Sequence, residues 1–237
     1  MAPKNVLPTL LLSLPPMLLD ERPLAFDVPG WLWEIKFDGY RLMAEFGRGK
    51  CELKTRGGAR ATLWFPEIVR ALSNVRAFPG GPYVVDGEVC VLDDIGRSDF
   101  DRLHARAKRR CWYAGADPVT YAVFDLLVDG GKDITGLPLV ERKERLLALL
   151  DPVPASILPV GHFADGSEQL FREAVVPLAL EGLVAKRADS LYAAGVRTAD
   201  WVKVKRKGAI PPQRFSRSVR SEPTGASVPG EARTSSP

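Results

Sequence analysis

Hydrophobic and polar positions alternate over several short stretches of the chain, and this period of two residues predicts β-strands. Gly47-Arg48-Gly49 separates two such stretches and is typical of a β-hairpin turn. Asp86-Gly87 falls inside another stretch, so we expect a pair of short strands there. Residues 119–128 are mostly β-branched and aromatic, which predicts a buried strand. The expected strands are 31–37, 41–46, 50–55, 83–92, 119–128, 182–187 and 201–205.

Apolar side chains return at spacings of three and four residues in other stretches, which predicts amphipathic helices. The most regular of these covers residues 139–150, where Glu141 and Arg145 lie four apart on the expected outer face. The segment 100–110 is basic as well as amphipathic. The expected helices are 66–72, 100–110, 139–150 and 171–180.

Strands and helices mixed in this order predict an α+β domain at residues 21–207. Residues 1–20 are expected to be an extended lead-in that packs its leucines on the domain. Its apolar stretch 7–19 is too short to cross a membrane and is broken by Pro8, Pro15 and Pro16. From residue 208 the chain is rich in Pro, Ser, Gly and Arg, which predicts a disordered tail at 208–237.

Charge and cysteine content give only weak indications of the binding partners and the cellular compartment. The formal net charge is +4 over 237 residues, with a pI near 9.0, which leans towards polyanionic partners. The cysteines, Cys51, Cys90 and Cys111, are odd in number and include no close pair. We therefore expect idle thiols in a reducing cytoplasm, with neither disulfides nor a zinc site.

The first candidate for chemistry is Lys36, which ends an apolar strand and is followed by the turn Asp38-Gly39. Partial desolvation and nearby cations both disfavour a charged ammonium, so such a lysine offers more free amine to an electrophile. Gly39 permits a tight turn, and Arg41 would return a guanidinium to the same pocket. A surface strand ending in a charged turn is the alternative, and the Lys-x-Asp-Gly pattern alone does not exclude it.

Later segments place more charged and aromatic side chains on expected strands. Asp86 and Glu88 lie among apolar residues, where carboxylates are costly unless they meet a cation, a metal or a sugar hydroxyl. Lys203 and Lys205 share one side of a strand because side chains repeat every two residues. Structural salt bridges, a core aromatic and a solvated strand face are the alternatives. The remaining candidates are Arg56 beside two glycines, Phe124 on the buried strand, and Glu181 with Lys186.

Taken in order, these six segments resemble the covalent nucleotidyltransferase superfamily of ATP-dependent DNA ligases, RNA ligases and mRNA capping enzymes. The resemblance covers residues 15–207 and is most specific to the ligase domain of bacterial end-joining ligases. It is carried by Pro15-Pro16-Met17, by residues 33–41 and by residues 192–205. It implies an ATP-grasp-like adenylation fold in which antiparallel sheets flank a nucleotide cleft.

The resemblance also implies a role for each matching residue. Lys36 would attack the α-phosphate of ATP, expel pyrophosphate and carry AMP, which then passes to the 5′-phosphate of nicked DNA for strand sealing in repair and recombination. Glu34, with Ile35 beside it, would read the adenine edge while Phe124 stacks on its face. Arg41 and Glu88 would hold the ribose. Glu88 and Glu181 would face Mg²⁺ or Mn²⁺, and Lys203 and Lys205 would bind phosphates.

Nicked duplex DNA is the partner that the resemblance implies, with Arg56, Arg197, Arg106 and Arg109 as candidate contacts. Family ligases continue into an OB-fold after the last lysine motif, and we expect none here. Self-adenylation would then be slow and the grip on DNA weak, unless an OB-fold module or end-joining proteins act in trans. The basic tail (Lys205, Arg206, Lys207, Arg214, Arg217, Arg220) would bind phosphates or stay solvated without a role.

Two other functions remain open at this point. An RNA ligase or capping guanylyltransferase would share the same superfamily pattern. A non-catalytic module that binds nucleic acid or a partner would keep the fold without the reaction. For the leading hypothesis, an ATP-dependent DNA ligase adenylation domain, we expect a cytoplasmic monomer that meets DNA at the nucleoid.

Overall fold

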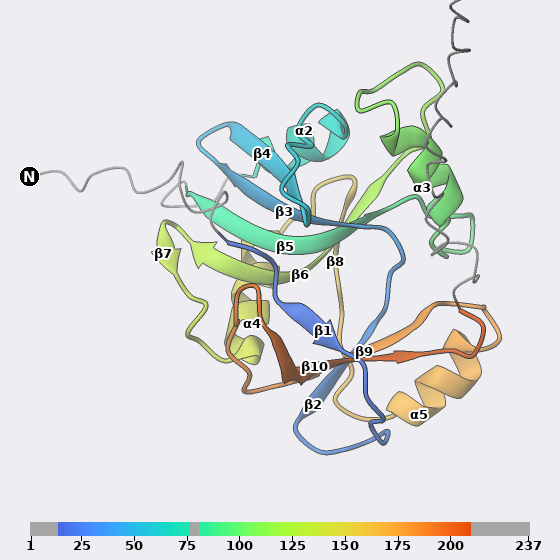
Figure 1. The fold of residues 1–237 in the computed structure, drawn as a ribbon. Coiled ribbons are helices and arrows are strands. Elements are labelled where there is room, and N and C mark those ends of the chain that lie inside the picture. Colours follow the sequence, from blue (N-terminus) through green and yellow to red (C-terminus); the bar gives the residue numbers. More distant parts are fainter. Residues whose placement is uncertain (1–13, 76–80, 210–237) are drawn as a thin grey trace, which may run out of the picture.

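The computed structural model describes residues 14–75 and 81–209, whose elements are arranged around two β-sheets (Figure 1). Residues 1–13 of the predicted lead-in (1–20) and residues 210–237 of the predicted disordered tail (208–237) lie outside the described residues. The mixture of helices and mainly antiparallel sheets confirms the predicted α+β class. Within the described residues, no helix combines the length and the apolar character that a membrane crossing requires.

The larger sheet has the strand order β4-β3-β5-β6-β7, and β8 pairs with β6 in parallel. Its hairpin turns at Arg48 and Gly49, both with positive φ, as the turn prediction requires. The register of β3 against β5 sets Arg41 opposite Glu88. The strands are β3 (Tyr40–Gly47), β4 (Lys50–Thr55), β5 (Tyr83–Cys90), β6 (Thr120–Asp129), β7 (Lys132–Asp133) and β8 (Ile157–Pro159).

The smaller sheet has the order β1-β10-β9-β2 and is antiparallel except for the β1–β10 pair. Its register sets Lys203 of β10 and Glu34 of β2 opposite the same residue of β9, Val184. Leu18 donates its backbone N–H to Val196, so the lead-in forms an edge strand of this sheet. The strands are β1 (Leu18–Asp20), β2 (Trp31–Ile35), β9 (Gly182–Arg187) and β10 (Arg197–Lys205).

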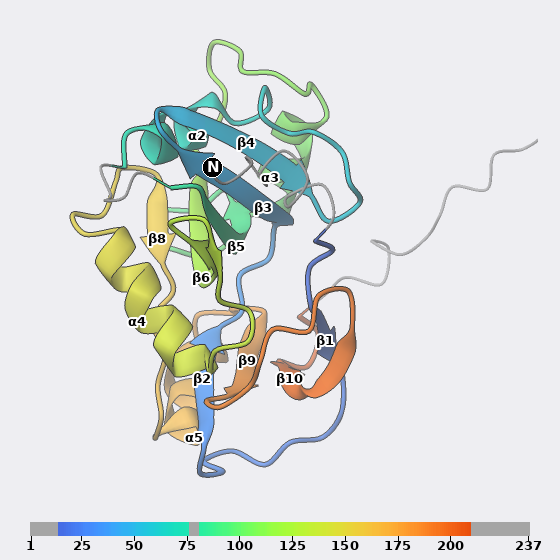
Figure 2. The ribbon, with the colours of Figure 1, turned by 90° about the vertical axis from the view of Figure 1, so that its left-hand side faces the viewer.

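Helices cover the sheets and extend the apolar cores (Figure 2). The helices α2 (Pro66–Ser73) and α3 (Phe100–Ala107) pack on the larger sheet through Ile68, Leu72 and Leu103. The helix α4 (Leu139–Leu149) contributes Leu146 to that core and Leu139 to a second one, which Met17 and Trp201 share. A third core lies under the smaller sheet, against α5 (Ser167–Leu170) and the π-helical turn η1 (Phe171–Val175).

Some element predictions were wrong, and packing explains the largest difference. Asp86-Gly87 does not divide its strand: β5 is continuous, because buried Asp86 is neutralised by Arg41 and the irregularity falls instead on the pairing with β6. A Cβ at Gly87 would lie 2.6 Å from the carbonyl oxygen of Ala122, so this position needs glycine. The helix predicted at 171–180 begins earlier, at Ser167, after the left-handed Gly166.

Candidate nucleotide-binding site

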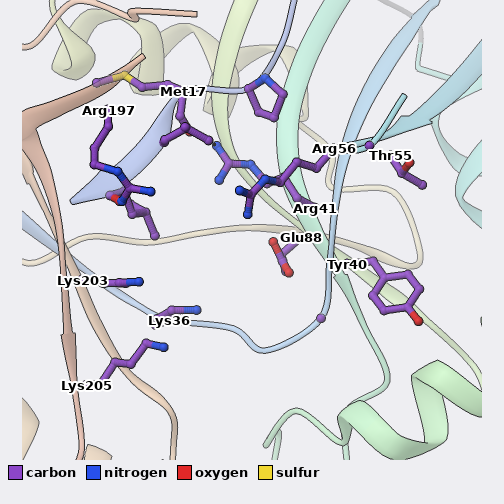
Figure 3. A pocket seen from close by; sticks show the side chains of 15 residues that line it. Met17, Lys36, Tyr40, Arg41, Thr55, Arg56, Glu88, Arg197, Lys203 and Lys205 are labelled. Atoms are coloured by element: carbon purple, nitrogen blue, oxygen red, sulfur yellow. Dashed lines mark hydrogen bonds between the residues drawn. The ribbon is translucent and has the colours of Figure 1, made fainter. Parts of the chain in front are cut away.

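A pocket of about 390 Å³ opens between the two sheets, and six of the residues that line it are lysines or arginines (Figure 3). Lys36, Lys203 and Lys205 gather on the side of the smaller sheet, and Glu88 lies across from them with Arg41 and Arg56. Residues 16–19 of the lead-in close a further wall. The structure thus brings most of the predicted phosphate and nucleotide contacts into one place.

Lys36 lies directly after β2 and is held at both its backbone and its side chain. Its N–H donates to the carbonyl of Gly182 at 3.0 Å, and its Nζ donates to Glu181 Oε2 at 2.6 Å. The other oxygen of Glu181 lies 3.4 Å from Lys205 Nζ. The Lys36 side chain is 17% exposed and that of Glu181 5% exposed. One buried carboxylate therefore bridges two lysines, and the predicted partial desolvation of Lys36 is confirmed.

The turn after Lys36 depends on a close backbone approach at Gly39. A Cβ at this position would lie 2.0 Å from the carbonyl oxygen of Val89 in β5, which no side chain allows. Glycine therefore lets the loop pass tightly against β5 before β3 begins at Tyr40. The close approach explains why glycine follows three residues after Lys36, at the junction of the two sheets.

Arg41 forms the most completely buried ion pair of the pocket wall. Its Nε and Nη2 donate to the two oxygens of Asp86 at 2.6 and 2.7 Å, and the Tyr192 hydroxyl donates to Asp86 at 2.6 Å. Burial opposes the charge on Arg41, but the attraction of Asp86 outweighs it and raises the pKa of the guanidinium. Arg41 is thereby fixed in orientation beside the pocket.

Glu88 faces the pocket and, among residues 14–75 and 81–209, forms no ion pair like the one between Arg41 and Asp86. Burial raises the pKa of this carboxyl to about 7, although Arg41 and then Lys36 act in the opposite direction. A carboxylate held in this way is suited to bind a cation or to accept a hydrogen bond from a hydroxyl group. Both uses match the roles that the resemblance implied for it, which stay predictions.

A smaller cavity of about 40 Å³ adjoins the pocket and is lined by Glu34, Phe124 and Lys186, among others. Cations already contact the predicted adenine platform: Arg41 Cζ lies 4.6 Å and Lys186 Nζ 4.2 Å from the Phe124 ring centroid. A base that stacks on this ring would have to share or replace these contacts. Glu34 is only 2% exposed and pairs with two lysines, so its carboxylate is already ionised and oriented.

The predicted nucleic-acid contacts divide into exposed and buried residues. Arg56 and Arg197 line the pocket, and Arg109 is exposed, with its guanidinium 3.9 Å from the Tyr113 ring centroid. The prediction for Arg106 was wrong: the residue is 1% exposed, pairs with Glu67 and packs on Phe65. Arg106 lies on the buried face of α3 beside Leu103, so it stabilises the domain and does not reach a ligand.

Sequence reasoning missed Lys143, which donates to Glu34 Oε1 at 2.7 Å from α4. A signal was present, because Lys143 lies four residues after Leu139 and three before Leu146, on the buried face of the helix. Reasoning also missed Tyr192 as the partner of Asp86. Among residues 14–75 and 81–209, no three His, Cys, Asp or Glu side chains form a group that could hold a metal ion by themselves.

Two sheets that flank a cationic pocket, with a half-buried lysine held between them by a carboxylate, have the architecture of a covalent nucleotidyltransferase. A family model described as "ATP dependent DNA ligase domain" matches residues 23–205. The chain belongs to this family.

Known relatives agree with that assignment. The multifunctional non-homologous end joining protein LigD of Pseudomonas aeruginosa is 34% identical over 180 residues, which are 74% of this chain and 20% of the relative. A probable DNA ligase of Beutenbergia cavernae is 37% identical over 174 residues, 73% of this chain and 33% of the relative. The chain thus spans a fifth to a third of the length of these curated relatives.

Solved structures give the same picture. The ligase domain of Mycobacterium tuberculosis LigD matches with a TM-score of 0.66 and 32% identity, over 81% of this chain and 59% of that one. A mycobacterial DNA ligase D complexed with ATP and MES matches with a TM-score of 0.65 and 31% identity, over 81% of this chain and 60% of that one.

Proposed function

We propose that this chain is an ATP-dependent DNA ligase adenylation domain that forms lysyl-AMP on Lys36 and transfers AMP to the 5′-phosphate of nicked DNA. The observation that carries the proposal is the pairing of Lys36 Nζ with Glu181 at 2.6 Å inside a pocket that Lys203 and Lys205 also line. The mycobacterial relative complexed with ATP supports the choice of nucleotide. The end-joining relatives support DNA as the second substrate.

In the first step, a bond forms between Lys36 Nζ and the α-phosphorus of ATP while the bond from that phosphorus to pyrophosphate breaks. Glu181 is hydrogen-bonded to Lys36 Nζ and is placed to receive a proton from the amine. Charge builds up on the reacting phosphate and the leaving pyrophosphate, and preorganised cations stabilise it. Lys203 and Lys205 supply that charge from β10, and Arg41 adds a fixed guanidinium from β3.

The carboxylates of the pocket fit a divalent cation that is shared with substrate phosphates. Glu88 and Glu181 offer hard oxygen ligands of the kind that Mg²⁺ or Mn²⁺ binds, and Mg²⁺ usually keeps several waters. Both oxygens of Glu181 contact lysines, so cation binding there would require one lysine to move onto a phosphate. When bound, the cation would add positive charge beside the reacting phosphate.

We propose that nicked duplex DNA approaches along the exposed arginines Arg56, Arg197 and Arg109. Such contacts to phosphates are salt-dependent and carry no sequence preference. An OB-fold module or end-joining proteins acting in trans would complete the grip on DNA. We also propose that the chain is a monomer that works in the bacterial cytoplasm and binds DNA at the nucleoid.

The direct test is to incubate the full chain with ATP and Mg²⁺ and to measure its intact mass. We expect a mass gain of one AMP, none for Lys36→Ala, and an unchanged gain for Lys50→Ala, an exposed lysine at the start of β4. Loss of the label on mixing with nicked DNA, together with sealed product, would support the second step. If the wild-type chain stays unlabelled at saturating ATP, the catalytic proposal is wrong, and a non-catalytic binding module is favoured instead.

A further inference from the structure

Two consecutive basic residues of α4 enter the protein interior, and only one of them has a clear structural role. Arg142 is fully buried, pairs with Asp125 at 2.8 Å through both oxygens, and donates to the carbonyls of Leu137 and Ser190. These contacts tie α4 to β6 and to the loop after β9. Lys143 reaches the other way, to Glu34 of β2, two residues before Lys36.

The Glu34 carboxylate is held by a lysine at each oxygen. Lys143 Nζ lies 2.7 Å from Oε1 and Lys186 Nζ lies 2.7 Å from Oε2, and all three side chains are at most 3% exposed. Burial alone would raise the pKa of Glu34, but the attraction of Lys186 and of Lys143 outweighs it and lowers the pKa. Burying three charges carries a large desolvation cost, so this cluster would add little to the stability of the fold. A purely structural role therefore does not explain it well.

The two lysines stand on different sides of this carboxylate. Lys186 lines the small cavity beside Lys36 and lies 4.2 Å from the ring centroids of Phe124 and Trp201, and its buried Nζ pairs with Glu34. Lys143 does not line the cavity, and its remaining contact is a 3.0 Å hydrogen bond to the carbonyl of Val160. A ligand in the cavity would therefore meet Glu34 and Lys186 and would not touch Lys143.

We propose that Lys143 is a positioning residue that holds Glu34 as a fixed, ionised acceptor and so sets the preference of the pocket for a 6-aminopurine over a 6-oxopurine. An ionised carboxylate only accepts hydrogen bonds, so it suits the exocyclic amine of adenine and repels the oxygen that guanine carries at the same place. Without Lys143 the carboxylate would protonate more easily and could then donate to that oxygen. The inference rests on the proposed function, because it assumes that the nucleotide enters the larger pocket and directs the 6-position of its purine into this cavity.

The test measures equilibrium binding of ATP and GTP by titration calorimetry in a Lys36→Ala background, which separates recognition from chemistry. The variants are Lys143→Met, Lys143→Arg, Glu34→Gln and the double variant Lys143→Met with Glu34→Gln. Arg145→Met is the matched control, since Arg145 lies on the exposed face of the same helix, in an ion pair with Asp129. Thermal melting checks that each variant is folded.

We expect Lys143→Met to reduce the ratio of ATP to GTP affinity about tenfold, as for one charged hydrogen bond. The ratio in this variant should also rise with pH between pH 5 and 8, as the released Glu34 ionises. The parent's ratio should stay flat, because Glu88 titrates in the pocket that both nucleotides share and so affects both alike. Lys143→Arg should restore most of the ratio, Arg145→Met should leave it unchanged, and the double variant should match Glu34→Gln.

A folded Lys143→Met protein with the parent's ratio and a flat pH profile would overturn the inference. An equal change in Arg145→Met would overturn it as well, and so would a parent that binds neither nucleotide. The proposed function fails separately, if the native chain discriminates between the nucleotides as expected but never acquires a covalent AMP.

Discussion

The two walls of the pocket hold their charges in different ways. On the wall of the smaller sheet, Lys36, Lys203 and Lys205 have side chains that are 17%, 21% and 23% exposed. Lys203 pairs with Glu21, whose side chain is 64% exposed. On the wall of the larger sheet, Arg41 is 14% exposed and its partner Asp86 is 0% exposed, with Tyr192 completing the network.

This difference separates charges that exchange partners from charges that stay in place. A partly exposed ion pair contributes little stability, so Lys203 can leave Glu21 for a phosphate at small cost. Lys205 can leave the buried Glu181 because Lys36 still neutralises that carboxylate. Removing one member of a buried pair leaves an uncompensated charge, which costs several kcal/mol. The lysine wall is therefore suited to follow the reacting phosphates, while the arginine wall preserves the shape of the pocket.

The largest effect is expected where the fixed wall is broken. Asp86→Ala should lower the free energy of unfolding by about 3–5 kcal/mol, because it strands the Arg41 guanidinium and the Tyr192 hydroxyl inside the protein. Urea denaturation at pH 7 measures the change. Glu52→Gln, which removes an exposed carboxylate paired with Arg60, should have little effect, and equal losses in the two variants would contradict the contrast.

Glu88 gives a pH-dependent test of the same wall. Because its pKa is raised from 4.5 to about 7 in the folded chain, the folded state binds this proton more tightly than the unfolded state. Its contribution to stability is complete below pH 4.5 and is lost as the pH rises to about 7. Glu88→Gln should therefore gain stability relative to wild type over this interval, by about 1–2 kcal/mol after allowance for solvent at the pocket mouth. Thermal melts of both proteins at pH 5, 6, 7 and 8 measure this. A difference in melting temperature that stays constant with pH would mean that the pKa of Glu88 is not raised.

Arg106 in α3 and Arg109 just after it extend the comparison between buried and exposed charges. Arg109→Ala should weaken binding to nicked DNA a few-fold and reduce the dependence of log affinity on log salt by about one contact, with no loss of stability. Arg106→Ala should lower the melting temperature, because it removes a buried guanidinium that pairs with Glu67. Fluorescence anisotropy at several salt concentrations, together with melting curves, distinguishes the two. The reverse pattern would place Arg106 at the surface.

The smallest effect is expected at Glu21. The neighbouring Lys203 lowers the pKa of the Glu21 carboxyl, so this group is charged and competes for the lysine at neutral pH. Glu21→Gln should free Lys203 for phosphate and lower the KM for ATP about two- to threefold, within the range of an exposed ion pair. Initial rates of lysine adenylation at varied ATP measure this. A raised KM would mean that Glu21 orients Lys203 and does not compete for it.

Much of the fold and part of the site could be predicted because they depend on local pattern. The β3–β4 hairpin, the three helices that begin near Pro66, Phe100 and Leu139, and the shared face of Lys203 and Lys205 follow from periodicity and turn residues. The order of the charged segments around Lys36 carried the family resemblance, which the comparisons confirmed.

The tertiary structure alone decided which charges meet. Lys143 and Glu34 are 109 positions apart along the chain, Tyr192 and Asp86 are 106 apart, and Lys36 and Glu181 are 145 apart. It also decided that Arg106 turns inward, that β5 runs unbroken through Asp86, and that the lead-in forms a pocket wall. Periodicity reports only whether a side chain lies on an inner or an outer face. The partner of a buried charge depends on how distant strands and helices pack, which no local pattern encodes.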